Sequence, residues 1–534
     1  MAYYKDLREH IRALEDRGLL VRIPWLINKD TELHPFVRLQ FRGLPEEQRK
    51  AFLFENVTDN RGRKFDMPVV IGTFGASREI YAVGLQCKPD EIMDVWTKAQ
   101  LNPKKTKMLP TGPVQEVVHM GKGLMDHGAL DEFPIPISTP GYDPAPFMTS
   151  PLLMTRDPET GIQNVGTYRV HIKSPTRTGA NFAPMTQKDA GRHWLKCREK
   201  GIPLQIAIVN GSSPNIGFCS VAKFPYGVNE LEVAGGLAGE SIEVVKCKTV
   251  DIEVPAHAEI VVEGIIPTDV IEPEAPFGEA AGYIGTRDMG AFMNVTCITH
   301  RRKPIWQAFL SQFPPSESSK IRQIGYENAI YKVLKYDMNI KAVLKVACHE
   351  SAGSAGMFVV QFKDATQEEI WKALERVGRT EGYTKFVVGV DWDINPWDAE
   401  AVNWAIALRM QPHRDSKIIF HGLSAQDHSG IKPGELIRDP SIKKEIEGSR
   451  LLLDATLKWG YPPVSLPRKD FMEHAIELWN KHDMPALKLK DPWYGYTLGY
   501  WPEENAEEAE MALRGEYYKT GEKLAARRKP SQEK

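Results

Sequence analysis

The chain has 534 residues, enough for several domains with their own cores. Lys and Arg total 68 against 70 Asp and Glu, a formal net charge of -2, so no global charge favours nucleic acid or an anionic membrane surface. No apolar run approaches the roughly 20 residues of a membrane helix, and the six cysteines include no C-x-x-C pair. We therefore expect a cytoplasmic protein with reduced thiols and a small-molecule partner.

The first predicted domain covers residues 1–115 and is of the α/β type. Residues 4–17 carry apolar residues at helical spacing, which predicts an amphipathic helix at the start of the fold. A β-like run follows at residues 67–74, and the residues after Pro89 return to helical spacing.

The second predicted domain covers residues 116–320 and has a different texture. Short runs rich in Val, Ile and Thr are broken by Gly and Pro, and residues 251–254 (DIEV) alternate between charged and apolar. Strands that follow one another so closely, with few helices between them, predict an antiparallel sheet or barrel.

The third predicted domain covers residues 321–490 and returns to strand-helix-strand order. Strands at residues 357–362 and 386–390 flank a helix that begins at Thr366, which predicts an α/β domain with a parallel component. The tail, residues 491–534, is charged and favours helix; it either packs on a neighbouring subunit or lies exposed.

Two glutamates stand five residues apart around a turn in the run IEPEAPFGEAAGY. In a regular strand or helix, Glu274 and Glu279 would point in different directions. The Pro276-Phe277-Gly278 turn between them allows the chain to fold back, so both carboxylates can reach one space. Two acids in one space separate their pKa values, which is how one holds a proton while the other stays ionised. Two solvated loop glutamates are the alternative.

A second candidate is the strand-like run QNVGTYRVHIK at residues 163–173. Arg169, His171 and Lys173 share one parity and therefore one face. Such a row is either a solvated cationic face or, with its arginine fork, a site for a carboxylate or phosphate. Asn164 lies five residues before Arg169, so it shares the face only if a bulge at Gly166 intervenes or if it precedes the strand.

A third candidate is the turn-rich stretch at residues 217–241, which leads into a helix predicted from Asn229. Asn229 would cap that helix and Glu230 would favour its N-terminal dipole. The loop ahead of the helix could instead hold a phosphate or a cation with backbone groups. His171, His193 and His257 form no ligand motif, so each is interpreted as a packed or surface histidine.

Several runs in the right order resemble the UbiD family of reversible decarboxylases that use prenylated FMN. They are DLREHIRALEDRGLLVRI, QNVGTYR, VNELEVAGGLAGE, VVKCKTVDIEVPAHAEIVVEG, EAPFGEAAGY and VVGVDWDINPWDAEAVNWAIALRMQP. The resemblance covers most of the chain. It implies an α+β fold with a central split β-barrel similar to flavin reductases, an N-terminal α/β domain and a C-terminal α/β domain used for oligomerisation.

In this family an arginine and two acids form the catalytic triad. The matching residues here are Arg169, Glu274 and Glu279. The resemblance implies that Arg169 holds the substrate carboxylate or positions the flavin, that Glu279 cycles a proton, and that Glu274 hydrogen-bonds Arg169 and tunes it.

The family also implies a divalent metal (Mn²⁺, Fe²⁺ or Mg²⁺) on the flavin phosphate, held by an Asn, a His and a Glu. Asn164 and Glu230 match the first and third. The expected His falls at Thr186, next to Gln187, so this chain departs from the pattern there, and a hydroxyl or amide oxygen suits a hard cation better than a soft one. The carbonyls of Cys219 and Ala222 and the hydroxyl of Ser220 match the position of a potassium ion, K⁺. The implied cofactor-binding residues are Asn164, Val165, Tyr168, Arg169, Met185, Thr186, Gln187, Ser220 and Glu230.

The resemblance implies the decarboxylation of an aromatic or α,β-unsaturated carboxylic acid, with a flavin prenyltransferase as the cofactor's supplier and a homo-oligomer, dimer or hexamer, as the assembly. An aryl-CoA thioester such as phthaloyl-CoA is one substrate hypothesis. Two alternatives stay open: an FMN-dependent oxidoreductase on the same fold, and a non-catalytic subunit of a carboxylase complex.

Overall fold

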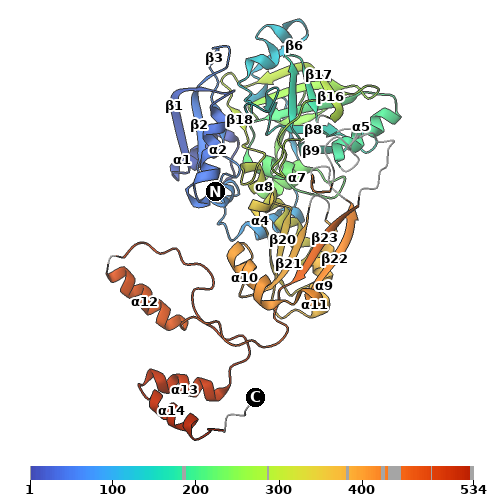
Figure 1. Cartoon of the computed structure of the whole chain (residues 1–534). Coiled ribbons are helices and arrows are strands. Elements are labelled where there is room, and N and C mark those ends of the chain that lie inside the picture. The colour runs from blue at the N-terminus through green and yellow to red at the C-terminus, as the bar shows by residue number, and fades with distance from the viewer. Residues whose placement is uncertain are drawn as a thin grey trace.

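The computed structural model describes residues 2–182, 188–285, 288–380, 384–422, 427–430, 447–482 and 484–529 (Figure 1). The architecture is mixed α+β, with four separate sheets in these residues. This agrees with the predicted fold class. Among the helices so described, none is both long and apolar enough to cross a bilayer. All six cysteines are free thiols, four of them buried.

The N-terminal region is built on a five-stranded sheet of order β1-β2-β4-β18, with β3 paired to β2. Its last strand, β18, lies far along the chain and pairs in parallel with β4. The N-terminal sheet is therefore completed only by residues beyond the central sheet. Its elements are α1 (Leu7–Asp16), β1 (Leu20–Asn28), α2 (Leu33–Gly43), β2 (Ala51–Thr58), β3 (Lys64–Phe65), β4 (Val69–Ile71), α3 (Arg78–Gly84), α4 (Ile92–Leu101) and β18 (Trp306–Ala308).

The central region is a ten-stranded, predominantly antiparallel sheet, as the closely spaced strands predicted. Its hydrogen-bonded path runs β7-β10-β11-β17-β15-β12-β8-β9, with β16 and β6 also paired to β17, and this path does not close among the described strands. The strands are β6 (Val117–Met120), β7 (Phe147–Met148), β8 (Leu152–Arg156), β9 (Gln163–Thr167), β10 (Val170–Ser174), β11 (Arg177–Ala180), β12 (Leu204–Asn210), β15 (Ile260–Ile266), β16 (Glu272–Glu274) and β17 (Asp288–His300).

Helices and a small sheet cover this central sheet. The helices are α5 (Asp189–Glu199), α6 (Pro214–Val221) and α7 (Glu230–Ala238), and the small sheet pairs β5 (Lys107–Met108), β13 (Glu243–Lys246) and β14 (Glu253–Pro255). The cap predicted for α7 is present, since the Asn229 side chain accepts a hydrogen bond from the Leu231 N–H at 3.0 Å. The cap fixes Glu230 at the first helical position.

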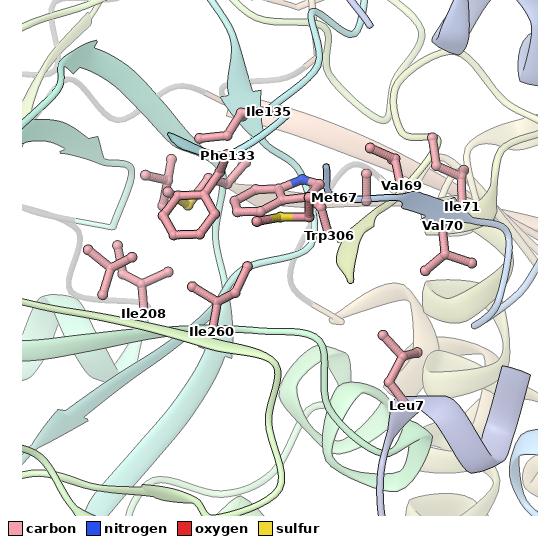
Figure 2. Packing of buried hydrophobic residues seen from close by; sticks show 14 of the residues in the cluster. Leu7, Met67, Val69, Val70, Ile71, Phe133, Ile135, Ile208, Ile260 and Trp306 are labelled. Carbon is pink, nitrogen blue, oxygen red and sulfur yellow. The ribbon is translucent and has the colours of Figure 1, made fainter. Parts of the chain in front are cut away.

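One hydrophobic core joins the N-terminal and central sheets. Leu7 from α1 and Trp306 from β18 belong to the same buried cluster as Phe133, Ile208 and Ile260 of the central region, as Figure 2 shows. Apolar burial of this kind stabilises a fold by about 25 cal/mol per Å². The two regions are therefore packed as one body.

The C-terminal region has the predicted parallel component. Strands β20, β21 and β23 are parallel, with β19 and β22 added antiparallel at the edges. The helix predicted to begin at Thr366 is α9, and Thr366 and Glu369 form a capping box at its start. The elements are α8 (Glu317–Lys332), β19 (Val343–Cys348), β20 (Met357–Phe362), α9 (Gln367–Gly378), β21 (Phe386–Asp391), α10 (Ala399–Arg409), α11 (Pro412–Asp415), β22 (Ser416–Gly422) and β23 (Glu447–Asp454).

The tail extends away from the rest of the molecule (Figure 1). It contains α12 (Lys469–Lys481), α13 (Glu503–Leu513) and α14 (Tyr517–Ala525), and none of these helices has a buried residue in the chain as described. Tertiary packing normally supplies most of the stability of a helix of this length. Apart from the contact between α13 and α14, these helices gain no buried packing from the described residues.

Candidate active site

A cleft opens between the central sheet and the start of α8. It encloses about 740 Å³, part of it open to solvent, and its walls include Tyr168, Arg169, Glu279, Phe309 and Ile321.

Arg169 is held in this cleft by two carboxylates. Its Nε donates to Glu274 Oε1 at 3.4 Å, and its Nη1 donates to Glu279 Oε1. The side chain of Glu274 is 2% exposed and that of Glu279 is 14% exposed. Burial lowers the pKa of Arg169, but the charges of Glu279 and Glu274 more than offset this, so the net pKa is raised. Arg169 is a fixed cation at the cleft wall.

Arg169 lies between two strands, where the sequence interpretation expected one continuous strand. Residues 163–173 do not form one strand: β9 ends at Thr167 and β10 begins at Val170. The pairing of β8 with β9 is regular, so the bulge expected at Gly166 is wrong, and Asn164 lies within the strand rather than before it. A Cβ on residue 166 would lie 2.4 Å from the Tyr168 ring, so glycine lets Tyr168 fold back there.

The run after β16 brings Glu279 to the same guanidinium as Glu274. Glu274 ends β16, paired with Asp288 of β17, and Gly278 forms an antiparallel bridge with Ile284. A Cβ on residue 278 would lie 2.4 Å from the Gln312 side chain, so this tight run also needs glycine. The fold-back expected from the sequence brings both carboxylates onto Arg169.

Asn164 and Glu230 meet on the other side of β9. Asn164 Nδ2 donates to Glu230 Oε1 at 2.9 Å, and the Val165 N–H donates to Glu230 Oε2 at 2.8 Å. Burial raises the pKa of Glu230 to about 8. The buried Asn164 Oδ1 has no hydrogen-bond partner within the part of the chain that the structure describes. A buried carboxylate beside an unsatisfied amide oxygen is a set of oxygen donors that suits a cation.

The hydroxyl of Ser220 links the end of α6 to the cleft. It donates to the Gly217 carbonyl at 2.7 Å and lies 2.7 Å from the hydroxyl of Thr167, which lines the cleft. Ala222 caps the C-terminus of α6, directly after Cys219, Ser220 and Val221. The expected ligands at Met185, Thr186 and Gln187 lie outside the described residues.

The cationic row predicted on one face is not a single site. His171 stacks on Phe147 with ring centroids 4.9 Å apart, and Lys173 pairs with Glu272 at 2.6 Å. His193 lies 2.9 Å from the Thr155 hydroxyl, and His257 lies 2.8 Å from Glu243. Only Arg169 of the row lines the cleft.

Sequence reasoning missed several polar residues of the cleft, among them Asn181 and Lys188. Asn181 Nδ2 donates to Glu274 Oε2 at 2.7 Å and so holds the carboxylate oxygen that does not accept from Arg169. Lys188 lines the cleft with its Nζ 4.7 Å from the Tyr168 ring centre. Neither residue belongs to a motif, so no sequence signal marked it.

Three domain families match this chain in order. They are the 3-octaprenyl-4-hydroxybenzoate carboxy-lyase N-terminal domain over residues 11–100, the Rift-related domain over residues 106–313 and the C-terminal domain over residues 321–455. The chain belongs to the UbiD family. Members of the UbiD family are carboxy-lyases, so this protein is an enzyme of that class.

Relatives within the UbiD family include two proteins whose own descriptions give no function. One, from Archaeoglobus fulgidus, is 29% identical over 85% of this chain and 92% of its own length. The other, from Synechocystis sp., is 31% identical over 91% of this chain and 98% of its own length.

Solved structures of UbiD-class enzymes share the fold. The enzyme HmfF from Pelotomaculum thermopropionicum, in an evolved dimeric form in complex with prFMN (prenylated FMN), is 28% identical with a TM-score of 0.73, covering 87% of this chain and 97% of that one. The vanillic acid decarboxylase of Sedimentibacter hydroxybenzoicus in open form is 24% identical with a TM-score of 0.73, covering 90% of this chain and 100% of that one. At this identity the similarity concerns the fold only.

The ion pair predicts a stability effect for Arg169→Ala. The change leaves the buried carboxylate of Glu274 without its charge partner, so we expect the free energy of unfolding to fall by about 3 kcal/mol, the low end for breaking a buried pair because Asn181 still donates. Chemical denaturation measures the loss.

Arg177→Ala is the matched control for that change. The Arg177 side chain is 46% exposed and pairs with Glu272 at 3.6 Å, so its loss should cost no more than about 1 kcal/mol. Equal losses in the free energy of unfolding of the two variants would contradict a stabilising role for the pair of Arg169 with Glu274.

Proposed function

We propose that this protein decarboxylates an aromatic or α,β-unsaturated carboxylic acid, in a reversible non-oxidative reaction, with prFMN bound in the cleft. The observation that carries the proposal is Arg169 held at the cleft wall by two carboxylates of unequal exposure. Family membership supports the reaction class, and the prFMN bound by HmfF supports the cofactor.

Arg169 binds the substrate carboxylate. A guanidinium has five N–H donors in a planar fork, and Glu274 and Glu279 accept from two of them. The remaining donors can engage a carboxylate in the cleft. Glu274, which also accepts from Asn181, keeps the guanidinium in a fixed orientation.

Glu279 supplies the proton. The substrate carboxylate brings a further negative charge close to Glu279 when it approaches Arg169. This charge raises the proton affinity of the Glu279 side chain. Glu279, whose side chain is 14% exposed, takes up a proton from solvent and donates it to the carbon that loses CO2, and the freed Glu279 carboxylate returns to Arg169. The proton is balanced, because the acid R–COO⁻ and one proton give R–H and CO2.

The cofactor supplies the electron sink: prFMN, when bound, stabilises the electron pair that the departing CO2 leaves on the substrate carbon. The described residues fit such a group. The unsatisfied Asn164 Oδ1 and the Glu230 carboxylate would hold a divalent cation (Mn²⁺, Fe²⁺ or Mg²⁺) for its phosphate. Val165 and Tyr168 would contact the flavin from the end of β9.

A potassium ion fits beside this cation. The hydroxyl of Ser220 and the carbonyls of Cys219 and Ala222 are oxygen donors at the end of α6, and the hydroxyl of Thr167 lies 2.7 Å from that of Ser220. Oxygen donors of this kind suit a hard cation. Thr186 with Met185 and Gln187 completes the proposed binding set.

The walls of the cleft favour a flat, partly apolar acid. Phe277, Phe309 and Ile321 line it beside Arg169, and apolar walls with a few convergent polar groups are the usual pattern of small-molecule sites. Aryl acids fit this class, as do aryl-CoA thioesters such as phthaloyl-CoA, so a substrate screen should contain both.

The proposal extends to the organisation of the chain. We infer that the ten-stranded sheet curls into a split barrel over residues 116–320, between an N-terminal domain (1–115) and an oligomerisation domain (321–490) with a tail (491–534). The enzyme acts in the cytoplasm, where a flavin prenyltransferase supplies its cofactor.

Glu279→Gln tests the proton-transfer role. The amide keeps the shape of the side chain but cannot donate a carboxylic proton, so we expect turnover to fall by about 10²–10⁴-fold while flavin stays bound. The assay is decarboxylation of a panel of aryl and unsaturated acids by protein produced alongside a flavin prenyltransferase, with released flavin identified by mass spectrometry.

Glu272→Gln is the matched control, because Glu272 lies on the same strand as Glu274 but pairs with Lys173. It should keep wild-type turnover. Wild-type turnover in Glu279→Gln would overturn the triad, and plain FMN in folded protein supplied with prFMN would favour an FMN oxidoreductase.

Glu230→Ala tests the cation site. Loss of the carboxylate should remove the divalent cation and most of the flavin, measured by elemental analysis and flavin absorbance. Glu232→Ala, in the same first turn of α7, should keep both. Full flavin occupancy in Glu230→Ala would remove this residue from the site.

The cation site also predicts a pH dependence. A proton on Glu230 competes with the cation, and burial raises the pKa of Glu230 to about 8. The cation affinity of the wild type should therefore rise with pH up to about 8 and then level off.

We also propose that the tail binds a second copy of the chain, in a dimer or hexamer. No residue of the helices α12 to α14 is fully buried against the described residues, and Trp501, Tyr517 and Tyr518 are 45%, 71% and 58% exposed. Exposed aromatic side chains of this kind are enriched at protein interfaces. The dimeric form of HmfF supports self-association in this class.

Replacing Trp501, Tyr517 and Tyr518 together by serine should shift the protein to a smaller assembly, measured by light scattering after size exclusion. Trp25→Ser is the control, since Trp25 is 54% exposed on β1, and it should leave the mass unchanged. An unchanged mass in the triple variant would place the interface elsewhere.

A further inference from the structure

Three side chains that do not line the cleft meet at one end of the central sheet. His119 comes from β6, Glu132 ends the short 3-10 helix η4 (Ala129–Glu132), and His300 ends β17; their ligand atoms all lie within 4.8 Å of one another. It is the one such group of His, Cys, Asp or Glu found within the described ranges.

The strand pairing puts the two histidines on one face. His119 lies opposite Ile298 in the antiparallel ladder, and His300 is two residues beyond Ile298. Residues two apart share a face, so His119 and His300 are diagonal neighbours, within reach of each other's side chains.

The distances suit ligands around an ion better than hydrogen bonds. The two Nε2 atoms are 3.3 Å apart, and the Glu132 oxygens lie 3.8 Å from His119 Nε2 and 3.7 Å from His300 Nε2. Hydrogen bonds to oxygen lie at about 2.7–3.2 Å. Metal–ligand bonds of about 2.0–2.2 Å in a tetrahedron separate the ligand atoms by about 3.3–3.6 Å. The His257–Glu243 pair, by contrast, is a direct 2.8 Å hydrogen bond.

The tautomer of His300 already suits ligation. Its Nδ1 lies 2.6 Å from the Arg301 carbonyl oxygen, which can only accept, so Nδ1 carries the proton and Nε2 presents a lone pair to His119 and Glu132. A backbone acceptor on the far nitrogen is the usual way in which a metal-binding imidazole is oriented.

Glu132 has an unsatisfied oxygen beside the His119 ring. Its Oε2, 3.8 Å from His119 Nε2, is buried and has no hydrogen-bond partner among the described residues, and its side chain as a whole is 23% exposed. A buried carboxylate oxygen without a donor is costly unless a cation compensates it. A hydrogen bond between the two imidazoles alone would leave this oxygen unexplained.

We propose that His119, Glu132 and His300 bind a divalent transition metal of the zinc type. Two imidazole nitrogens and a carboxylate are donors that suit zinc and not magnesium or calcium. His127, an exposed residue whose ring centre is 4.8 Å from that of His119, offers a further imidazole for the fourth position.

The metal crosslinks the chain segment that leads into the central sheet to the end of strand β17. Glu132 is followed by Phe133, whose ring packs 5.7 Å from that of Trp306 in the shared core. An ion at this site ties β6 and η4 to the last residue of β17, next to that core. The site is separate from the cleft: Glu274 pairs with Asp288 at the other end of the 13-residue β17, up to roughly 40 Å away at about 3.3 Å per residue.

Cobalt is the probe for this site. Full-length protein stripped with a chelator is titrated with Co²⁺ and followed by visible absorption, then challenged with Zn²⁺. The wild type should give the intense bands of four-coordinate cobalt, which Zn²⁺ removes. The oxygen-rich set around Glu230 gives only weak six-coordinate bands, so Glu230→Ala should keep the intense signal.

Variants at the cluster decide the assignment. His119→Gln and Glu132→Gln should each lower zinc affinity by at least about 100-fold, because the loss of a residue that only hydrogen-bonds to a ligand already costs about 10–100-fold. His257→Gln, which disrupts an ordinary His–Glu hydrogen bond, should leave zinc affinity unchanged.

Thermal stability gives a second measurement of zinc binding. Zn²⁺ should raise the unfolding temperature of Glu230→Ala, but not that of the double variant Glu132→Gln/Glu230→Ala, because a ligand stabilises only a folded state that binds it. No four-coordinate cobalt signal in the wild type overturns the proposal, and so does a signal that survives in both cluster variants. If His119→Gln fails to fold, the partly exposed Glu132→Gln and the wild-type spectrum still decide.

Discussion

The pairing of β17 with its neighbours is the interaction on which the rest of the molecule depends. This 13-residue strand is hydrogen-bonded to β11, β15, β16 and β6. At its start it fixes Glu274 of β16 beside the cleft, and at its end it carries His300. Backbone groups buried in a sheet must all be paired, so a strand shared by four partners can shift only if all of them shift.

The cleft combines this rigid frame with an arginine whose two partners are not equivalent. Glu274 is almost fully buried and also accepts from Asn181, whereas Glu279 lies on the short hairpin of Gly278 and Ile284 at the cleft wall. Burial disfavours an isolated charge but strengthens the attraction within a pair, so the buried Glu274 depends on its partners Arg169 and Asn181. One carboxylate is thereby suited to hold Arg169, and the other to exchange a proton with what binds there.

Features with a local cause could be predicted from the sequence. The cap at Asn229, the capping box at Thr366 and the strand order after α8 each depend on residues a few positions apart. The break between β9 and β10 was missed, because it depends on the ring of Tyr168 folding over Gly166 and on partners from other strands. The three-residue cluster at the far end of β17 was invisible for the same reason: His119, Glu132 and His300 are distant in sequence and match no spacing.

The place of β18 in the N-terminal sheet affects how the chain folds as it is made. Residues of β1, β2 and β4 leave the ribosome first, but their sheet gains its last strand only when Trp306–Ala308 follow, after every strand of the central sheet has been synthesised. Contacts between residues so distant along the chain form slowly, and an unpaired β4 edge can recruit other strands meanwhile. The N-terminal sheet therefore stays incomplete on the nascent chain until residues 306–308 have emerged, and over that interval its exposed edge is open to mispairing.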